Sequence, residues 1–241
     1  SKLLYKCIPD DKRLPIFLVP FNLNTKHFSK EYINKYVIFK FANWDNKHPI
    51  GMLTQVIGNI DVENNYYEYV LHCKCLNTSM TYFNRSMHQR LKTKSADHYF
   101  DTILKTTSLQ DRRSINVYTI DSSKTLDYDD AFSIVNYDDY IVLSIYIANV
   151  SIWLDVLNLW EAFSRRVSTI YLPDKKHPML PVILSENLCS LKQGIDKIAL
   201  AMDIKIKDDI IDISYHNTII NVNRNMVYQS DELLENKDYQ Y

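Results

Sequence analysis

Residues 117–132 read VYTIDSSKTLDYDDAF and join a predicted strand to an unusually acidic turn. The β-branched, apolar start predicts a strand that delivers Asp121, and further carboxylates follow at Asp127, Asp129 and Asp130. Carboxylates held this close repel one another, so that one or more takes up a proton unless a cation lies among them. Mg²⁺ prefers oxygen ligands and is usual where the other ligands are phosphates and water. The stretch therefore predicts metal-assisted chemistry on a phosphate group.

Three other interpretations of this acidic turn remain open. A short acidic loop between strands is often only a solvated turn, because Asp favours turns through local hydrogen bonds. A calcium loop of the EF-hand type fits poorly, because position three is Ser123 and the glycine needed at position six is Leu126. The triplet DYD at 127–129 also matches the DxD of sugar-nucleotide transferases, although no nucleotide-binding strand–loop pattern accompanies it.

The composition indicates a folded protein with one large domain or two small ones. The 241 residues are 46% hydrophobic and 24% charged, which is ordinary for a globular chain that buries a real core. The net charge of −1 provides no overall basic field, which argues against a purely electrostatic nucleic-acid binder. Basic residues concentrate between 85 and 113, where they form either a local groove or a solvated helical face with a linker.

No stretch has the features of a membrane span or a secretion signal. The best candidate for a span, 140–153, is short and polar in places, and charged residues at 10–13 interrupt the N-terminal stretch. The four cysteines show no disulfide framework, and the HCKC run at 72–75 lacks a second ligand pair for zinc. We therefore expect a reducing, intracellular location, cytoplasmic or nuclear, with no membrane partner.

Hydrophobic patterning predicts a mixed α+β chain. Residues 1–105 are expected to form an OB-type barrel with a trailing helix, 106–114 a polar linker, and 115–241 a second domain. Strands of the first domain are predicted at 35–43, 50–60 and, from alternation, 66–75, before helical spacing at 79–105. In the second domain we predict strands at 115–120, 131–136, 140–148, 198–206 and 210–220, and helices at 155–167 and from Ser230.

Three blocks of the second domain resemble the ribonuclease II (RNB) family of exoribonucleases. The stretch quoted first matches the family's metal-binding block, in which four aspartates stand at relative positions 0, +6, +8 and +9. STIYLPDKKHPMLPVILSENLCSL at 168–191 resembles the family's YLPD…PMLP…LS…LCSL run. The third and weakest block joins IALAMDIKI at 198–206 to NVNRNMVYQSDELLEN at 221–236. IPDDKRLP at 8–15 and the strand GMLTQVIGNI look like the RNA-binding OB (cold-shock-like) domain of exosome-type eukaryotic members.

The resemblance implies processive 3′→5′ hydrolysis of single-stranded RNA to nucleoside 5′-monophosphates with Mg²⁺, for which Mn²⁺ can substitute. The chemistry agrees, because metals held by carboxylates neutralise a phosphodiester and make a water nucleophilic. We expect Asp121 and Asp130 to hold the main Mg²⁺ and Asp127 and Asp129 to complete the cluster. Asp129 is further expected to help activate water or to hold a second metal.

The resemblance also implies two RNA-contacting tyrosines. At one position the sequence differs from the family pattern. Tyr171 matches a tyrosine that stacks on the 3′-terminal base, with a core tyrosine as the alternative. Tyr228 matches a later tyrosine near the RNA path, with packing against the following helix as the alternative. The family block HIADVS stands here as YIANVS at 146–151, so that Asn149 replaces an acid near the expected catalytic strands.

The family's catalytic domain continues well past the last residue of this sequence. We therefore expect an incomplete catalytic domain, whose remainder belongs to the same protein, to a separate chain or to an exosome-like complex. The leading hypothesis is the N-terminal portion of an exoribonuclease. The alternative is a non-catalytic RNA-binding or scaffold remnant of such an enzyme.

Overall fold

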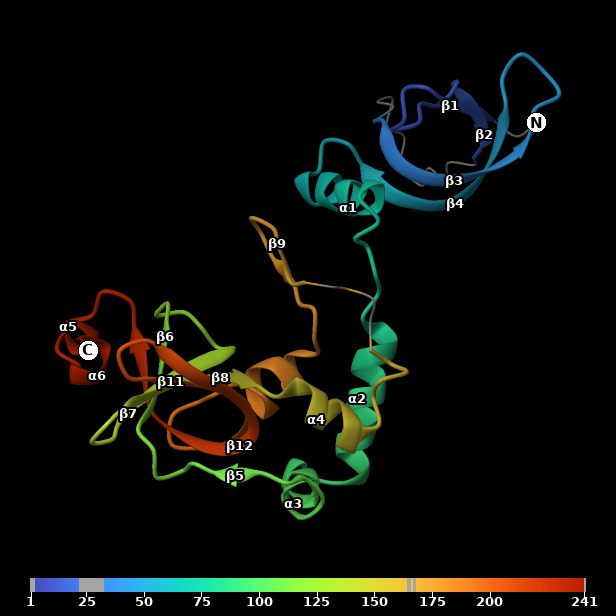
Figure 1. Cartoon of the computed structure of the whole chain (residues 1–241). Helices are drawn as coiled ribbons and strands as arrows, with labels where there is room; N and C mark the ends of the chain where they lie inside the picture. Colours follow the sequence, from blue (N-terminus) through green and yellow to red (C-terminus); the bar gives the residue numbers. More distant parts are fainter. Residues whose placement is uncertain (1–2, 22–32, 164–165, 167, 241) are drawn as a thin grey trace. The chain divides into compact units, whose positions relative to one another are not determined.

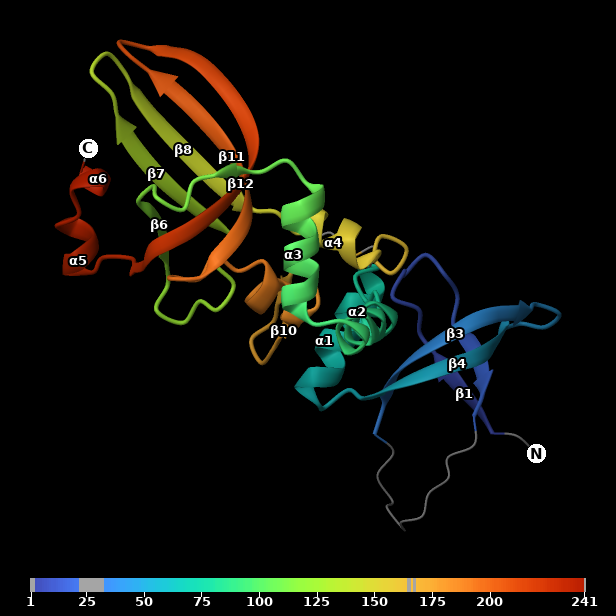
Figure 2. The same ribbon diagram turned by 90° about the horizontal axis from the view of Figure 1, so that it is seen from below.

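The computed structural model describes residues 3–21, 33–163, 166 and 168–240, which divide into two compact units. Unit 1 comprises Ser1–Thr78 with Ile170–His177, and unit 2 comprises Ser79–Thr169 with Pro178–Tyr241. Figures 1 and 2 show the elements of each unit from two directions. The helical region that was expected to trail the first domain is therefore part of unit 2.

Unit 1 is built on a four-stranded sheet in the order β1-β2-β4-β3. The strands are β1 Leu4–Cys7, β2 Phe17–Pro20, β3 Lys35–Asn43 and β4 Ile50–Asn59. β2 and β4 run parallel, whereas β1–β2 and β3–β4 are antiparallel pairs. Figure 1 shows β3 and β4 as long, curved strands, and three register shifts along this pair favour such curvature. β3 and β4 confirm the strands predicted at 35–43 and 50–60.

The strand predicted at 66–75 is wrong, because helix α1 (Glu63–Cys73) occupies most of this run. Residues alternate in polarity here, but apolar residues also recur every three to four positions from Tyr66 onward, as in a helix. In the helix, Tyr69 stacks on Tyr36 of β3 with the ring centroids 4.3 Å apart. The sequence is compatible with the two-residue period of a strand and with the 3.6-residue period of a helix, and packing against the sheet favours the helix.

A short hairpin from later in the chain completes unit 1. β9 (Ile170–Tyr171) pairs antiparallel with β10 (Lys176–His177). Lys175 Nζ lies 2.9 Å from Glu68 Oε1 of α1, and this ion pair ties the hairpin to the helix. Tyr171 consequently lies in unit 1.

Unit 2 contains a six-stranded sheet in the order β11-β8-β7-β6-β12-β5, in which β11 also pairs with β12. Its strands are β5 Gln110–Asp111, β6 Val117–Asp121, β7 Asp130–Asn136, β8 Ile141–Ala148, β11 Asp196–Ile206 and β12 Ile210–Val227. The first half of β12 pairs with β11 and the second half with β6, so five of the strands close into a ring. All five strands predicted for the second domain are confirmed, as β6, β7, β8, β11 and β12.

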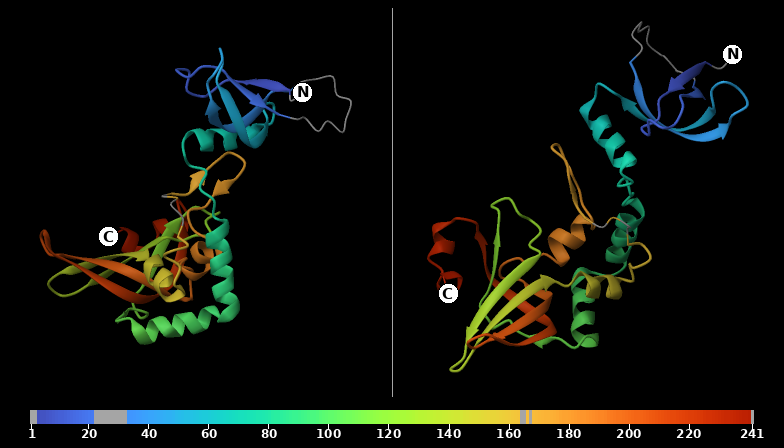
Figure 3. Two further views of the ribbon diagram at one scale, coloured as in Figure 1. Left: turned by 90° about the vertical axis from the view of Figure 1, so that its right-hand side faces the viewer. Right: turned by 45° about the horizontal axis from the view of Figure 1, so that its top comes forward.

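The helical region predicted at 79–105 forms two helices, α2 (Thr81–Thr93) and α3 (Ala96–Thr106). They separate because Lys94 is extended and Ser95 caps α3, accepting a hydrogen bond from the amide of His98 at 3.2 Å. Figure 3 shows α2 and α3 meeting at a corner. None of the described helices is long and apolar enough to cross a membrane.

The helix predicted at 155–167 begins and ends earlier, as α4 (Val150–Leu157). It ends because Asn158 adopts a left-handed conformation with φ 51°, and residues 164, 165 and 167 lie outside the described residues. The start predicted at Ser230 is confirmed, since its Oγ accepts a hydrogen bond from the amide of Leu233 at 3.2 Å. The remaining helical elements are η1 Ile183–Leu188, α5 Asp231–Leu234 and α6 Lys237–Gln240.

The hydrophobic core of the described residues lies mostly in unit 2. Side chains of α2, α3, α4 and η1 pack there against the sheet, among them Phe83, Ile103, Trp153, Leu184, Tyr146 and Ile220. Figures 1 and 2 show α2, α3 and α4 on one side of this sheet and α5 and α6 on the other. Full burial of one such side chain is worth about 1.5–3 kcal/mol. The sheet that carries the acidic turn is therefore well supported.

The segment 106–114, predicted to be a polar linker, contributes to the fold of unit 2. β5 pairs with β12. Both terminal nitrogens of Arg112 donate hydrogen bonds to the carboxylate of Asp203, each at 2.6 Å, and Ser144 Oγ donates to the same carboxylate at 2.7 Å. Polarity alone did not reveal this role, because a charged residue can be buried when a partner balances its charge.

Candidate active site

The β6–β7 hairpin brings the four predicted aspartates to one end of the sheet in unit 2. Asp121 is the last residue of β6, and Asp130 is the first residue of the antiparallel β7. Asp127 and Asp129 lie in the connection between the two strands. Asp121 and Asp127 are half-buried, whereas Asp129 and Asp130 are exposed. The hairpin thus offers both sheltered and accessible carboxylates at one site.

The electrostatics show that these carboxylates interact. Burial raises the pKa of Asp121 above its ordinary value, and the charges of Asp130, Asp129 and Asp127 raise it further, while a hydrogen bond with Thr119 opposes them. The proton is therefore held more tightly at Asp121 than at a solvated Asp. A bound cation would remove this penalty, since it would replace repulsion with attraction.

The donor set has the chemistry of a site for a hard divalent ion, because all four groups are carboxylates. Within the described ranges, however, no three His, Cys, Asp or Glu side chains are arranged to hold a metal ion. The quartet is close enough for mutual repulsion, and a cation would have to draw its members further together.

Ser190 holds the connection between β6 and β7. Its side chain is fully buried, accepts a hydrogen bond from the amide of Tyr128 at 3.0 Å, and donates to the carbonyl of Leu126 at 3.0 Å. The amide of Leu191 donates to the carbonyl of Tyr128 at 2.9 Å. These three bonds fix the backbone on both sides of Asp127 and immediately before the next acid.

Asn225 links the same segment to the strand that carries Asp121. Its Nδ2 donates to Thr119 Oγ1 at 2.8 Å and to the carbonyl of Leu191 at 3.0 Å. Its Oδ1 accepts a hydrogen bond from the amide of Gln193 at 2.8 Å. Because Thr119 lies two residues before Asp121 on β6, the network also reaches the strand that carries this acid.

The structure places the two predicted RNA-contacting tyrosines in different units. Tyr228 follows β12 directly, its amide donates to the carbonyl of Asp121 at 3.0 Å, and its side chain is exposed. Tyr171 is exposed in β9 of unit 1. Neither tyrosine is a core residue, and Tyr228 lies beside the acidic quartet.

Asn149, which stands where the family has an acid, caps helix α4. Its Oδ1 accepts hydrogen bonds from Ser151 Oγ at 2.7 Å and from the amide of Ile152 at 3.4 Å. Its Nδ2 donates to Asn217 Oδ1 at 2.9 Å. Asn and Asp serve equally well as helix caps, so the departure preserves local structure.

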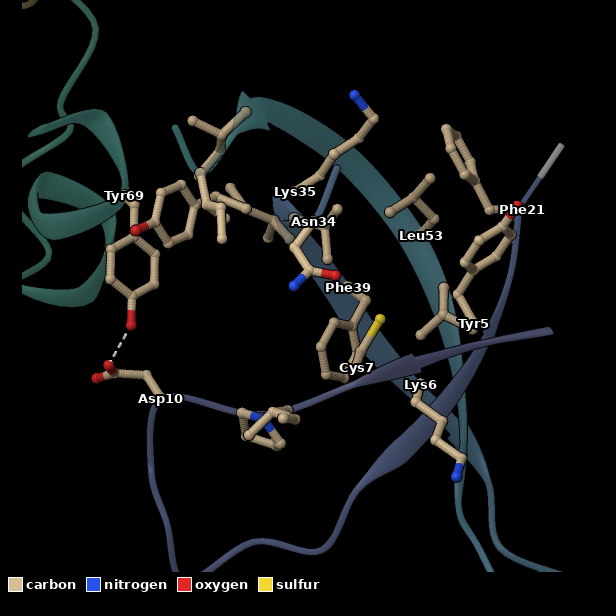
Figure 4. Close-up of a pocket in the computed structure, with 18 of the residues that line it drawn as sticks. Tyr5, Lys6, Cys7, Asp10, Phe21, Asn34, Lys35, Phe39, Leu53 and Tyr69 are labelled. Carbon is tan, nitrogen blue, oxygen red and sulfur yellow. Dashed lines mark hydrogen bonds between the residues drawn. The ribbon is translucent and has the colours of Figure 1, made fainter. Parts of the chain in front are cut away.

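A hollow of about 980 Å³ lies against the sheet of unit 1. In Figure 4, Tyr5 and Phe21 stand at one end, Tyr69 with its hydrogen-bond partner Asp10 stands at the other, and Phe39 lies between them. The lining also contains Lys6, Asn34 and Lys35. It therefore combines several aromatic faces with a few polar and cationic groups.

Reasoning from the sequence missed Ser190, Asn225 and Thr119. Ser190 belongs to the LCSL run that was quoted for the family resemblance, so a signal existed without a role attached to it. Asn225 lies in an asparagine-rich strand, where no pattern distinguishes it from its neighbours. Only the folded geometry shows that these residues meet around the quartet.

The fold and this site define a class of protein in which an OB-type unit accompanies a closed-sheet unit with a carboxylate cluster. The RNB domain model matches residues 109–240, and the chain belongs to the RNB family. The model of the Dis3-like cold-shock domain 2 (CSD2) matches residues 4–72. The predicted family and the predicted mixed α+β fold, with an OB-type domain before an RNB domain, are confirmed.

Two curated relatives are similar over more than half of the chain. Ribonuclease R of Chlamydia trachomatis is 34% identical over 135 residues, which are 54% of this chain and 20% of that protein. DIS3-like exonuclease 2 of Caenorhabditis elegans is 25% identical over 254 aligned positions, covering 96% of this chain and 29% of that protein. The chain thus spans about a fifth to a third of the length of these relatives.

Solved structures share the fold of nearly the whole chain. The apo form of Mycoplasma genitalium RNase R matches with a TM-score of 0.70 and 22% identity, covering 97% of this chain and 38% of that one. Yeast Ssd1, described as a pseudonuclease, matches with a TM-score of 0.63 and 17% identity, covering 93% of this chain and 29% of that one. At these identities the likeness concerns the fold alone.

Proposed function

We propose that this chain carries the metal-binding part of a 3′→5′ exoribonuclease that hydrolyses single-stranded RNA to nucleoside 5′-monophosphates with Mg²⁺. One observation carries the proposal: in an RNB-family chain, all four aspartates of the acidic block gather at one end of the β6–β7 hairpin. The raised pKa of Asp121 supports it, because burial and then the neighbouring like charges disfavour its charged form at a cost to folding. A bound divalent ion would compensate the repulsion among the carboxylates.

Each carboxylate then has a role. A bound Mg²⁺, or Mn²⁺ in its place, would neutralise the phosphodiester and favour ionisation of a bound water. Asp121 and Asp130 are our choice as main ligands, and Asp127 completes the set. Asp129 is exposed, so it can reach the substrate side, where it would orient the attacking water and accept its proton.

The exposed tyrosines and the hollow of unit 1 would hold the RNA strand. Base stacking on an aromatic side chain contributes about 1–3 kcal/mol per base and tolerates every sequence, as an exonuclease requires. Tyr228 is exposed beside Asp121, which suits a base near the reacting phosphate. Tyr171 and the aromatic lining of the hollow provide further stacking faces in unit 1.

The direct test is incubation of a protein that contains this chain and the rest of the catalytic domain with a 5′-labelled single-stranded RNA and Mg²⁺. A ladder that shortens from the 3′ end is expected. Asp129→Asn should slow it by about 10²–10⁴-fold, the usual contribution of a general base, and leave RNA binding nearly intact. A wild-type rate in this variant would contradict the role of Asp129, and cleavage from the 5′ end would contradict the proposed direction.

A second candidate is a non-catalytic RNA-binding or scaffold protein. The shared fold of yeast Ssd1, described as a pseudonuclease, favours it. Thermal stability separates the two candidates, because an ion that binds only the folded state raises the melting temperature. No rise in millimolar Mg²⁺ or Mn²⁺ would favour the scaffold.

The proposed activity also requires further polypeptide besides this chain. Because the chain spans only 20% of Ribonuclease R from Chlamydia trachomatis, we propose that the remaining catalytic groups come from further polypeptide. That polypeptide would belong to the same protein, to a separate chain or to an exosome-like complex, in the cytoplasm or nucleus where RNA is degraded. Restoration of RNA hydrolysis by a longer or added chain would test this dependence.

A further inference from the structure

The acidic quartet is joined to the rest of unit 2 by a polar network that the proposed chemistry does not itself use. The network centres on the connecting segment 190–193, between η1 and β11. One end of it is the hydroxyl of Ser190, which bonds the backbone of the β6–β7 connection at Tyr128 and Leu126. The other end is Asn225 of β12, which bonds the segment at two points.

We infer that Ser190 and Asn225 are positioning residues that keep the carboxylates near one another, so that a divalent ion can draw them together. Ser190 fixes the side of the quartet that carries Asp127 and Asp129. Asn225 fixes the side that carries Asp121, because it bonds Thr119 of the same strand. The inference rests on the proposed function, and it adds residues that touch neither the ion nor the RNA.

The repulsion among the carboxylates explains why such a network is needed. A free loop would relieve the repulsion by moving its acids into water, and the connection between β6 and β7 has no regular secondary structure to prevent this. Ser190 itself is fully buried and its hydrogen bonds are partly buried, so breaking them would leave polar groups without partners. The network thus keeps the quartet gathered before any cation arrives.

A second feature of the network is that it joins three distant parts of the chain. Asn225 uses both hydrogens of its amide and its oxygen at once, on Thr119, Leu191 and Gln193. No other type of side chain can reproduce this set, since it requires two donors and one acceptor on one short planar group. Loss of Asn225 should therefore loosen β6, β12 and the connecting segment from one another.

Two matched controls lie in the same sheet. Ser133 is also a fully buried serine, but its hydroxyl bonds only Tyr146 among the described residues, at 3.0 Å. Asn223 also joins β12 to the β6 side, but it does so at Val117 and Asn116, at the start of that strand. Alanine at these positions removes comparable hydrogen bonds without touching the quartet's network.

The test measures the dissociation constant of Mn²⁺ on the full chain from the dependence of the melting temperature on metal concentration. Ser190→Ala and Asn225→Ala should each weaken Mn²⁺ binding by about 10–100-fold, the usual effect of losing an outer-shell partner. Ser133→Ala and Asn223→Ala should lower the melting temperature without metal but keep the dissociation constant within about twofold of the wild type. The double variant Ser190→Ala/Asn225→Ala should cost less than the sum of the two effects, because one network carries both.

The outcomes separate this inference from the proposed function. Wild-type Mn²⁺ affinity in Ser190→Ala and Asn225→Ala, with affinity lost in Asp121→Asn, would overturn the positioning role and leave the metal site standing. No Mn²⁺ response in the wild type would overturn the metal site and the positioning role together. Should Ser190→Ala fail to fold, Ser190→Cys keeps the shape of the side chain with a weaker donor, and it should weaken binding less than alanine does.

Discussion

Asp121 and Asp203 are carboxylates of the same closed sheet, and their surroundings shift their pKa values in opposite directions. Burial would raise the pKa of Asp203, but hydrogen bonds from Arg112 and Ser144 outweigh it and leave the pKa below its ordinary value. At Asp121, burial and the neighbouring acids act in the same direction and raise the pKa. The fold supplies a counter-charge for Asp203. At Asp121 it disfavours the charged form.

The difference teaches how to separate structural from functional acids in this protein. A carboxylate whose partners are all supplied by the chain contributes to stability, as the bidentate pair with Arg112 does. A carboxylate held among like charges lowers stability, and a protein retains it where an external ion or substrate compensates. Five experiments test this contrast.

The largest expected effect is that of Asp121→Asn on RNA hydrolysis. The rate should fall by more than the ~10–100-fold that loss of an outer-shell partner costs, because the variant lacks a proposed ligand itself. Without metal, its melting temperature should equal or exceed that of the wild type, since one repelling charge is gone. A clear loss of stability without metal would show that Asp121, like Asp203, stabilises the fold, and would contradict the contrast between the two acids.

Arg112→Met should lower the free energy of unfolding by about 3–5 kcal/mol, because it leaves a largely buried carboxylate without its cation. Urea unfolding of the full chain measures this change. The control is Arg112→Met/Asp203→Leu, which removes both charges and should regain most of the lost stability. Equal stability of the single and double variants would show that the unpaired Asp203 carboxylate does not cause the loss of stability.

The pH dependence of stability should have opposite signs at the two acids. The pKa of Asp203 is lowered in the folded state, so its contribution is complete above the unfolded value, 3.8, and is lost as the pH falls through the folded pKa. The stability advantage of the wild type over Asp203→Asn should therefore shrink in acid. For Asp121 the pKa is raised, so the disadvantage of the wild type against Asp121→Asn should appear as the pH rises above 3.8. Urea midpoints of the wild type and both variants across this pH range measure the two dependences. A pH dependence of the same sign at both acids would contradict the prediction.

Asn149→Asp tests whether the departure from the family block matters. Asp caps a helix as well as Asn does, so the change in unfolding free energy should stay below about 1 kcal/mol, whereas Asn149→Ala should cost about 0.5–2 kcal/mol. Thermal unfolding of both variants measures the difference. A larger loss in the Asp variant would show that the amide bond to Asn217 matters more than the cap.

The smallest effect is expected for Asp138→Asn and Asp139→Asn. These adjacent acids are exposed in the turn between β7 and β8, and in the part of the chain that is described neither carboxylate has a hydrogen-bond or ion-pair partner. Each change should alter stability by no more than about 0.5 kcal/mol and leave RNA hydrolysis unchanged. A marked loss of activity would extend the site beyond the β6–β7 hairpin.

The strands of unit 2 and the acidic block could be predicted from sequence because both are local patterns. β-branched runs define β6, β7 and β8, and the spacing of four aspartates identifies the family block. Helix α1 was predicted as a strand, because its residues satisfy both the two-residue and the 3.6-residue period. The role of segment 106–114 was missed, because pairing with β12 and with Asp203 involves residues far away in the chain.

By itself, the sequence determined that four carboxylates would follow one strand, that the chain resembles the RNB family, and where most strands of unit 2 begin. The tertiary structure alone decided which acids are balanced and which are not. Charge balance depends on partners such as Arg112, Ser190 and Asn225, which the sheet and its connections bring together from distant positions. A linear pattern records that an acid is present, whereas its pKa depends on the three-dimensional distribution of charge and solvent around it.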